Sequence, residues 1–228
     1  MNIKLITLAI VAATTSFTVS ATQNKYVALI VNNSLYAIEE NNQIGCVGPE
    51  LTRSELSLKI TNGDDVTKAC VSQISDFSNL FKNNATFNQD ISSWDTSSAT
   101  SFTSMFENAS SFNQDIGKWD TSNVTSIEGM FSGATSFNQN LNDWNVSKVG
   151  LFNGMFAGAT SFNQPLDKWD TSGAFMWTAM FSGATSFNQD VSGWDVSGAQ
   201  NSIAWSSFRL NAPLIDAYVP QRFLNGGA

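Results

Sequence analysis

The chain has 228 residues, of which 42% are hydrophobic and 13% are charged, a balance that excludes a disordered chain and allows one domain with a large core. Eleven basic and nineteen acidic residues give a net charge of −8, so we expect neither nucleic acid nor an anionic membrane surface as a partner. The sequence contains no His, which removes the commonest general base and the commonest metal ligand.

Residues 1–21 have the pattern of a secretory signal peptide. An apolar stretch follows the positive charge of Lys4, and Ala21 ends a small-residue cleavage site. Thr and Ser interrupt the apolar stretch, which is shorter than the roughly 20 apolar residues that a membrane-spanning helix needs. We therefore expect a protein that is secreted or held at the cell surface, without insertion into the membrane.

Residues 22–68 precede the repeats described below, and we expect them to form an N-terminal cap that contains β structure. Two short apolar runs, Tyr26–Val31 and Ser34–Ile38, are separated by two Asn residues and predict a β-hairpin. Leu56–Ile60 alternates apolar and polar residues, which predicts a further strand. Such a cap would cover the apolar surface at the open end of a stack of repeats.

Cys46 and Cys70 are the only cysteines of the sequence and stand twenty-four residues apart. A cysteine pair in an exported protein predicts a disulfide, and closing a loop of this size contributes on the order of 3 kcal/mol. A metal or catalytic role is disfavoured because there is no Cys-x-x-Cys motif and no His to complete a site.

Residues 69–199 contain a 25-residue repeat, with one degenerate copy and five clear ones. A Phe-Asn-Gln motif, a Trp seven residues later and a Met-Phe pair all recur at this interval; the Phe positions are Phe87, Phe112, Phe137, Phe162 and Phe187, and the Trp positions are Trp94, Trp119, Trp144, Trp169 and Trp194. A fixed period of roughly 20–50 residues marks an architecture in which each unit buries its apolar side chains by stacking on its neighbours. Residues 200–228 lose the motif and are predicted to form a C-terminal cap.

One copy of the repeat gives the expected local structure. Residues 128–134 resemble a short helix or 3₁₀ turn that begins after a capping-box pattern and ends at Gly133, and residues 136–141 resemble a short strand. The predicted fold is therefore an α/β repeat solenoid of the leucine-rich-repeat type. Each 25-residue coil would hold a short parallel strand and a short helix or 3₁₀ turn, with caps at both ends.

The repeated aromatic residues are predicted to form the core, because a carbohydrate-binding row of Trp would have to face solvent. The repeated Asn residues predict a ladder of amides that joins successive coils. The alternative is that this column and the acidic column beside it point outward and form a ligand face. That candidate face comprises Asn88, Asp90, Asn113, Asp115, Asn138, Asn140, Asn163, Asn188 and Asp190.

Acidic residues recur along the repeats, with eleven acids against three Lys between Phe87 and Ala199. Calcium needs six to eight oxygen ligands, and one carboxylate per coil provides few of them. The glycine-rich repeat of calcium-binding β-helices is also missing. We therefore expect no cofactor, with calcium as the alternative, and we expect the Asp residues beside each Trp to form turns by hydrogen bonding to their own backbone.

Three copies of the repeat, FNQDISSWDTSSATSFTSMFENASS, FNQDIGKWDTSNVTSIEGMFSGATS and FNQPLDKWDTSGAFMWTAMFSGATS, resemble those of the BspA-like leucine-rich-repeat surface proteins. The resemblance extends over about residues 70–200. It implies a bacterial surface or secreted protein with a role in adhesion and in interactions with a host or with neighbouring cells.

The function that these observations favour is a non-catalytic binding or adhesion module. It would use one extended face of the repeats to hold a protein or a surface polysaccharide on host or neighbouring cells, and it would be a monomer. The first alternative is a structural, self-assembling component of an extracellular matrix. An enzyme is disfavoured because the sequence lacks His, a Gly-rich phosphate loop and a Gly-x-Ser-x-Gly motif, although paired carboxylates leave a glycan-active protein as a further alternative.

Overall fold

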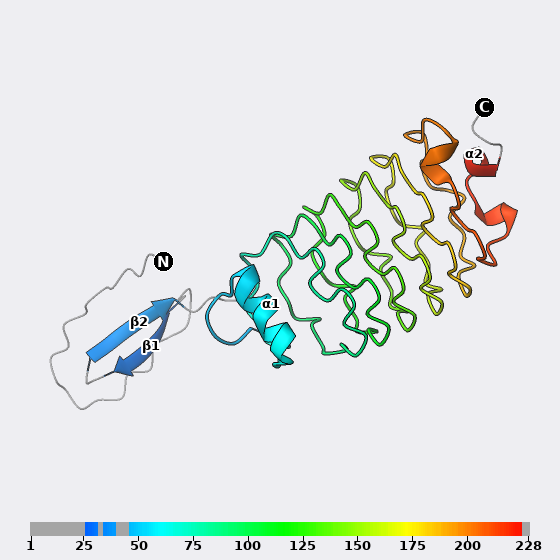
Figure 1. Ribbon diagram of the computed structural model, residues 1–228. Coiled ribbons are helices and arrows are strands. Elements are labelled where there is room, and N and C mark those ends of the chain that lie inside the picture. The colour runs from blue at the N-terminus through cyan, green and yellow to red at the C-terminus, as the bar shows by residue number, and fades with distance from the viewer. Residues whose placement is uncertain (1–25, 32–33, 40–45, 225–228) are drawn as a thin grey trace. The chain divides into compact units, whose positions relative to one another are not determined.

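The computed structural model describes residues 26–31, 34–39 and 46–224 (Figure 1). The chain divides into two compact units, residues 1–44 and residues 45–228. The predicted signal peptide, residues 1–21, lies outside the described residues. No helix in the described part of the chain is long and apolar enough to cross a membrane.

The first unit contains the predicted β-hairpin. Strand β1 (Tyr26–Val31) pairs antiparallel with strand β2 (Ser34–Glu39), with Tyr26 opposite Glu39 and Val31 opposite Ser34. Both strands are rich in apolar and β-branched residues, which favour a pleated strand.

The second unit begins near helix α1 (Arg53–Asn62), where the prediction of a strand at Leu56–Ile60 is wrong. Two end signals impose the helix: Thr52 and Glu55 form a capping box, and Gly63 ends the helix with a φ of 76°. Leu56 is fully buried, whereas Leu58 remains exposed, so the apolar alternation of this segment does not describe one buried sheet face.

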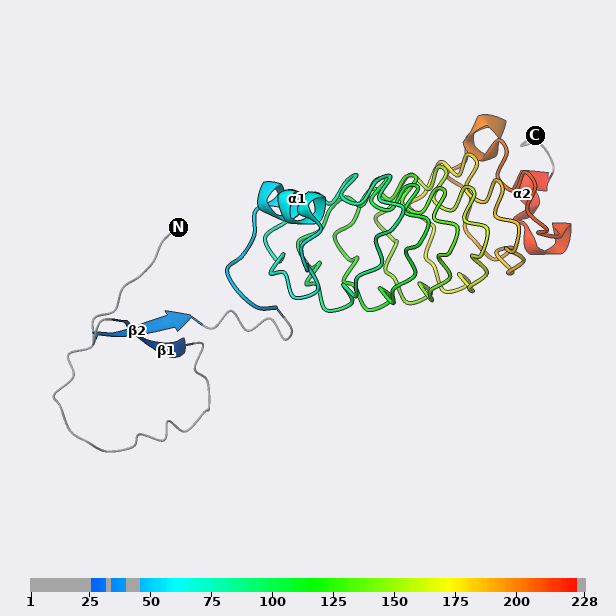
Figure 2. The same cartoon turned by 60° about the horizontal axis from the view of Figure 1, so that its bottom comes forward.

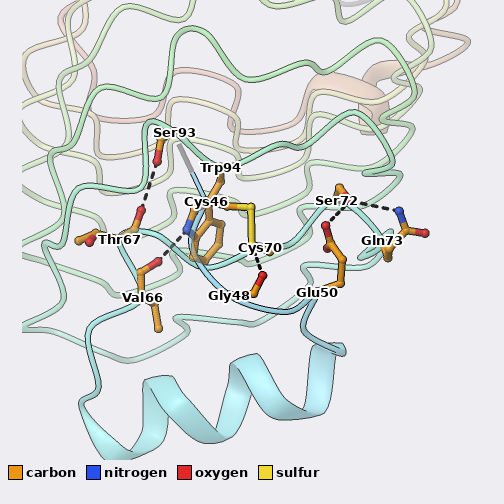
Figure 3. Close-up of a disulfide and its surroundings, with 10 residues drawn as sticks. All are labelled: Cys46, Gly48, Glu50, Val66, Thr67, Cys70, Ser72, Gln73, Ser93 and Trp94. Atoms are coloured by element: carbon orange, nitrogen blue, oxygen red, sulfur yellow. Dashed lines mark hydrogen bonds between the residues drawn. A yellow bond between two sulfur atoms is a disulfide. The ribbon is translucent and has the colours of Figure 1, made fainter. Parts of the chain in front are cut away.

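The predicted disulfide is confirmed. Cys46 and Cys70 are bonded to each other, with 5.0 Å between their Cα atoms (Figure 3). The Leu51 N–H donates to the Cys70 carbonyl over 2.9 Å, so the bridge and this hydrogen bond fix the segment before α1 to the beginning of the repeats.

The predicted α/β coil, with one strand and one helical turn in each repeat, is contradicted by the structure. Residues 64–201 contain no helix, and their β structure is limited to isolated parallel bridges of one residue per repeat. The bridges join Asp76, Ser101, Ser126, Leu151 and Met176 in succession. Residues 128–134, predicted as helical, form turns, and residues 136–141, predicted as a strand, are not in one.

Backbone conformation explains why no helix forms. Gly129 and Gly133 have φ values of 61° and 69°, and an α-helix requires a φ near −63° at every residue. The same two positions have positive φ in the other repeats: Asn79 and Asn83, Ser104 and Asn108, Gly154 and Gly158, and Ala179 and Gly183. Each repeat thus has two left-handed residues four positions apart, and they make the chain turn twice where an α-helix would have continued.

The N–H groups of this segment alternate between two kinds of hydrogen bond. The Met130 and Ser132 N–H groups close local turns by donating to the carbonyls of Ile127 and Gly129. The intervening N–H groups donate to the next repeat, twenty-four residues further on: Gly129 to Asn153 (2.9 Å), Phe131 to Met155 (2.9 Å) and Gly133 to Ala157 (2.7 Å). We call these segments the turn ladder, which comprises residues 77–83, 102–108, 127–133, 152–158, 177–183 and 205–211.

The repeats stack along one axis (Figure 1), and one continuous core runs through them that includes the Phe and Trp columns. The predicted aromatic core is confirmed: Phe131 stacks on Phe137 with ring centroids 3.9 Å apart and on Phe156 of the next repeat at 5.7 Å. Trp144 is 4% exposed, and its Nε1 donates to the Ile116 carbonyl over 3.1 Å. The Trp column is therefore internal and does not form a carbohydrate-binding row.

The last turn ladder segment, residues 205–211, lies within the predicted C-terminal cap. The Phe181 N–H donates to the Phe208 carbonyl, which is twenty-seven residues further along the chain. The corresponding donor and acceptor in the other repeats are twenty-four residues apart, so three residues are inserted here. The 3₁₀ helices η1 (Ser202–Trp205) and η2 (Asp216–Tyr218) and helix α2 (Gln221–Leu224) complete this end. Both views show α2 beside the last repeat (Figure 2), and Phe223 of α2 stacks on Trp205 with 5.1 Å between the ring centroids.

Candidate binding surfaces

The Asn residues of the predicted ligand face join one repeat to the next. The Asn138 Oδ1 accepts the N–H of Asn163 over 2.9 Å and the Nε2 of Gln164 over 3.0 Å. The oxygens of Asn88, Asn113 and Asn163 accept the corresponding pairs of hydrogen bonds. The Asn side-chain oxygens are thus occupied by neighbouring repeats, as expected for an amide ladder.

The acidic column of the predicted ligand face forms turns. The Oδ1 atoms of Asp90, Asp115, Asn140 and Asp190 each accept the N–H of the residue two positions on, over 2.9–3.0 Å. Hydrogen bonds from the hydroxyl and the N–H of Ser92 hold the pKa of Asp90 below its ordinary value of 3.8, and Ser192 does the same to the pKa of Asp190. These carboxylates therefore carry charge while they shape the backbone.

The second acidic column, beside the Trp residues, makes the same kind of turn. The Asp120 and Asp195 Oδ1 atoms accept the N–H groups of Ser122 and Ser197, and Asn145 occupies the equivalent position without a charge. Within the described residues, no group of three or more acidic or Cys side chains gathers in a way that could hold a metal ion. A hollow of about 390 Å³ lies beside Asp190 and is lined also by Pro165, Gln189 and Trp194.

A different surface follows the parallel bridges, and we call it the bridge face. It comprises the bridge residues Asp76, Ser101, Ser126, Leu151 and Met176, the residues before them (Ser75, Thr100, Thr125, Gly150 and Phe175), and Ile203, which continues the second column after the insertion. In its N-terminal half every side chain except that of Asp76 is a hydroxyl, and the bridge residues Ser101 and Ser126 contact the hydroxyls that stand two residues after the preceding bridge positions. The Ser78 and Ser101 Oγ atoms are 2.8 Å apart, and the Thr103 Oγ1 and Ser126 Oγ atoms are 2.6 Å apart.

The C-terminal half of the bridge face is apolar. Leu151 and Met176 replace the bridge Ser residues, and Phe175 is 49% exposed and Ile203 is 68% exposed. The Phe175 ring lies over the backbone of Gly150, where a Cβ would be only 2.5 Å from it. Our sequence analysis missed this surface. The signal was a large apolar residue in a column that holds Thr100 and Thr125 in earlier repeats.

The family model described as "Mycoplasma protein of unknown function, DUF285" matches residues 53–153 and, in a second overlapping copy, residues 118–209. The two matches together span more than half of the chain. The chain belongs to the DUF285 family. Comparison with curated proteins and with solved structures found no match to this DUF285 protein.

The first limit of the DUF285 match coincides with a structural boundary. The match begins at Arg53, the first residue of α1, and ends at Arg209, in the last segment of the turn ladder. The matched region therefore comprises α1 and the repeats as far as Arg209, and the hairpin of β1 and β2 lies outside it.

Proposed function

We propose that this DUF285 protein is a secreted or surface-associated bacterial binding module of the BspA-like kind, which holds a partner protein without catalysing a reaction. The signal-peptide pattern and the resemblance of the repeats support export and adhesion. The observation that carries the proposal is the apolar half of the bridge face, where Phe175 and Ile203 stand exposed in a column whose earlier repeats carry hydroxyl groups. An apolar patch with a polar margin is typical of a protein-binding surface.

The structure favours a protein partner for this surface. An aromatic side chain buries about 150–250 Å² in a contact, and aromatic residues at the centre of an interface often contribute about 2 kcal/mol or more to binding. Phe175 is held in place because its N–H donates to the Gly150 carbonyl over 3.0 Å and its ring lies on that glycine. These contacts restrain Phe175 before a partner arrives, and such a restraint reduces the entropy lost on binding.

The test compares binding of the purified full chain and of two variants to intact bacterial and host cells. The double variant Phe175→Ser, Ile203→Ser removes the two exposed apolar side chains, and the control Leu58→Ser removes a side chain of similar exposure (61%) on α1. We expect the unmodified chain to show saturable binding. The affinity of the double variant should be about tenfold or more weaker, as expected when at least one anchor of the interface is lost, and the affinity of the control should be unchanged. Unchanged binding of the double variant would exclude the bridge face, and the absence of binding to any cell would contradict adhesion.

A further inference from the structure

Alternate peptide groups of the turn ladder form continuous hydrogen-bond chains along the stack. One chain runs from the Asn79 N–H through five hydrogen bonds to the Ser206 carbonyl; its donors are Asn79, Ser104, Gly129, Gly154 and Ala179. Two parallel chains run from Phe81 to the Phe208 carbonyl and from Asn83 to the Leu210 carbonyl. All these peptide groups have the same orientation, so their dipoles add, as they do in a helix.

Helix α1 precedes the carbonyl end of these chains, and its Arg53 occupies the Ser78 carbonyl, at which the first chain begins. Leu56 of α1 stands twenty-five residues before Phe81 and is fully buried like it, so the helix occupies the place of a preceding repeat. Beyond its first turn, a helix uses its N–H groups in its own hydrogen bonds and does not donate them to a neighbour. The Arg53 guanidinium donates in their place, with Nε 2.9 Å from the Asp76 carbonyl oxygen and Nη2 on the Ser78 carbonyl, which also puts a cation at the negative end of the dipoles.

The N–H end of the chains is open as far as the described residues extend. Ser207, Arg209 and Asn211 continue the three donor columns, and Ser207 and Asn211 repeat the positive φ values of the earlier repeats (56° and 62°). Within the described residues, none of these three N–H groups has an acceptor. Phe223 of α2 packs on Phe208 with 5.0 Å between the ring centroids, so α2 covers the aromatic core at this end, and no described residue accepts a hydrogen bond from the row of donors.

A hollow lies against this row of donors. Its volume is about 550 Å³, and its lining includes residues 205–211 together with Val219, Phe223 and Leu224. Residues 200–224 contain two Arg and one Asp, a net charge of +1, whereas residues 87–199, with eleven acids and three Lys, carry −8. The donors, the positive end of the peptide dipoles and the local charge all favour an occupant that is rich in acceptors and negatively charged.

We propose that this open end of the turn ladder, the donor end, binds an acidic peptide segment of a partner protein through the backbone N–H groups of Ser207, Arg209 and Asn211. In every earlier repeat, these donors bind backbone carbonyls on alternate residues of the next repeat. The N–H groups of Gly154, Phe156 and Gly158, for example, donate to the carbonyls of Thr178, Met180 and Ser182 over 2.7–2.9 Å. A second copy of this chain is a poorer fit, because α1 takes the place of a preceding repeat at its carbonyl end and Arg53 already occupies the Asp76 and Ser78 carbonyls. The donor end is separate from the bridge face, and either proposal stands or falls without the other.

The probe is a capped synthetic peptide that copies residues 124–136, VTSIEGMFSGATS, and carries one acid, Glu128. In the stack, the Glu128, Met130 and Ser132 carbonyls of this segment accept the N–H groups of the preceding repeat. The measurement is amide hydrogen exchange of the full chain by NMR, with and without peptide to saturation. In the free protein we expect the Ser207, Arg209 and Asn211 amides to exchange fast. Their counterparts in the preceding repeat, Ala179, Phe181 and Gly183, should be protected. When the peptide binds, the first three amides should become protected as well.

Each other result of this exchange experiment overturns the proposal. Amides that remain fast at saturating peptide would show that the donor end does not bind it. Protection in the free protein at every concentration would mean that the chain covers its own donors, and protection that grows with protein concentration would identify a second copy as the occupant. A peptide with Glu128→Gln should bind about twofold to fivefold more weakly, as expected for one charge near a dipole end, and equal affinity would exclude the acidic character of the partner.

A pair of variants isolates the backbone donor. Arg209→Pro removes the central N–H, and Arg209→Ala retains it, while both lose the side-chain contacts to the Leu214 carbonyl and to Asp216. We expect the Ala variant to bind the peptide and the Pro variant to lose about tenfold or more in affinity, the effect of one buried donor. Equal binding by two folded variants would contradict the proposal; if the Pro variant does not fold, the exchange experiment on the unmodified chain decides.

Discussion

Two Trp side chains make different use of the same indole N–H. The Trp144 Nε1 donates to the Ile116 carbonyl, as its counterparts do in the other repeats. Trp177 stands instead in the column of Phe77, Phe102 and Phe152, and its Nε1 is buried without an acceptor among the described residues. The first indole stabilises the contact between repeats, and the second carries the cost of a buried polar group.

The two Trp residues should therefore respond differently to replacement by Phe. Trp144→Phe leaves a buried carbonyl without its donor and should lower the free energy of unfolding by about 1–3 kcal/mol. Trp177→Phe restores the residue type of its column and loses no hydrogen bond. Its decrease in the free energy of unfolding should therefore be smaller than that of Trp144→Phe by at least about 1 kcal/mol. Urea unfolding of both variants measures the difference, and an equal or reversed order would contradict this assignment.

The Asn column gives a second prediction at this scale. Asn138→Ala removes the acceptor of two hydrogen bonds and should lower the free energy of unfolding by about 1–2 kcal/mol. Asn138→Asp keeps an oxygen at that position and should cost less. Urea titrations of the pair test the ladder directly, since an equal loss in both variants would mean that the acceptor oxygen contributes nothing.

At the scale of elements, Arg53 of α1 occupies two carbonyls at the beginning of the stack. Arg53→Ala should lower the free energy of unfolding by about 1.5–3 kcal/mol, because hydrogen bonds from a charged group to the Asp76 and Ser78 carbonyls are lost. Arg222→Ala, on exposed α2, is the matched control for the loss of a positive charge. If the two variants unfold at the same urea concentration, Arg53 does not stabilise the end of the ladder.

The elements also show what sequence could and could not predict. The period, the aromatic core and the disulfide followed from spacing and residue type, because stacked units repeat their buried positions. The turn ladder did not follow, because Gly133 was interpreted as the end of a helix, when Gly129 and Gly133 together mark two left-handed residues. Ser104 and Ala179 adopt the same conformation without the usual preference for it, since their N–H groups are held by a neighbouring repeat that local sequence does not reveal.

The candidate surfaces were harder to predict than the core. The Asn and Asp columns were correctly placed as repeated features, and the amide-ladder interpretation matches their hydrogen bonds. The bridge face and the donor end escaped prediction because they depend on where columns stop repeating. Phe175 stands in a column that holds Ser or Thr in the first three repeats, and Arg209 follows a three-residue insertion that shifts the last segment of the ladder.

At the scale of the whole molecule, the turn-forming carboxylates predict a dependence of stability on pH. Hydrogen bonds from the Ser two residues further on lower the pKa of each of these groups below 3.8: Asp90, Asp120, Asp170, Asp190 and Asp195. A carboxyl with a lower pKa in the folded state stabilises the protein above its unfolded pKa, and this contribution is lost as the pH falls through the folded value.

The expected result is a free energy of unfolding that is steady from neutral pH to about pH 5 and falls progressively below about pH 4. Asn140 and Asn145 make the same turns without a titrating group, so the double variant Asp90→Asn, Asp190→Asn should fold and show a shallower fall in acid. Urea unfolding at a series of pH values checks this, and an unchanged acid slope in the variant would show that these turns do not sense pH.

The central claim is that repeats are joined through alternate backbone N–H groups of the turn ladder. NMR scalar couplings across hydrogen bonds identify the donor and acceptor residues directly. We predict couplings from the amide nitrogens of Gly129, Phe131 and Gly133 to the carbonyl carbons of Asn153, Met155 and Ala157, twenty-four residues on. A coupling from Phe131 to the carbonyl four residues back, as in a helix, would contradict this account.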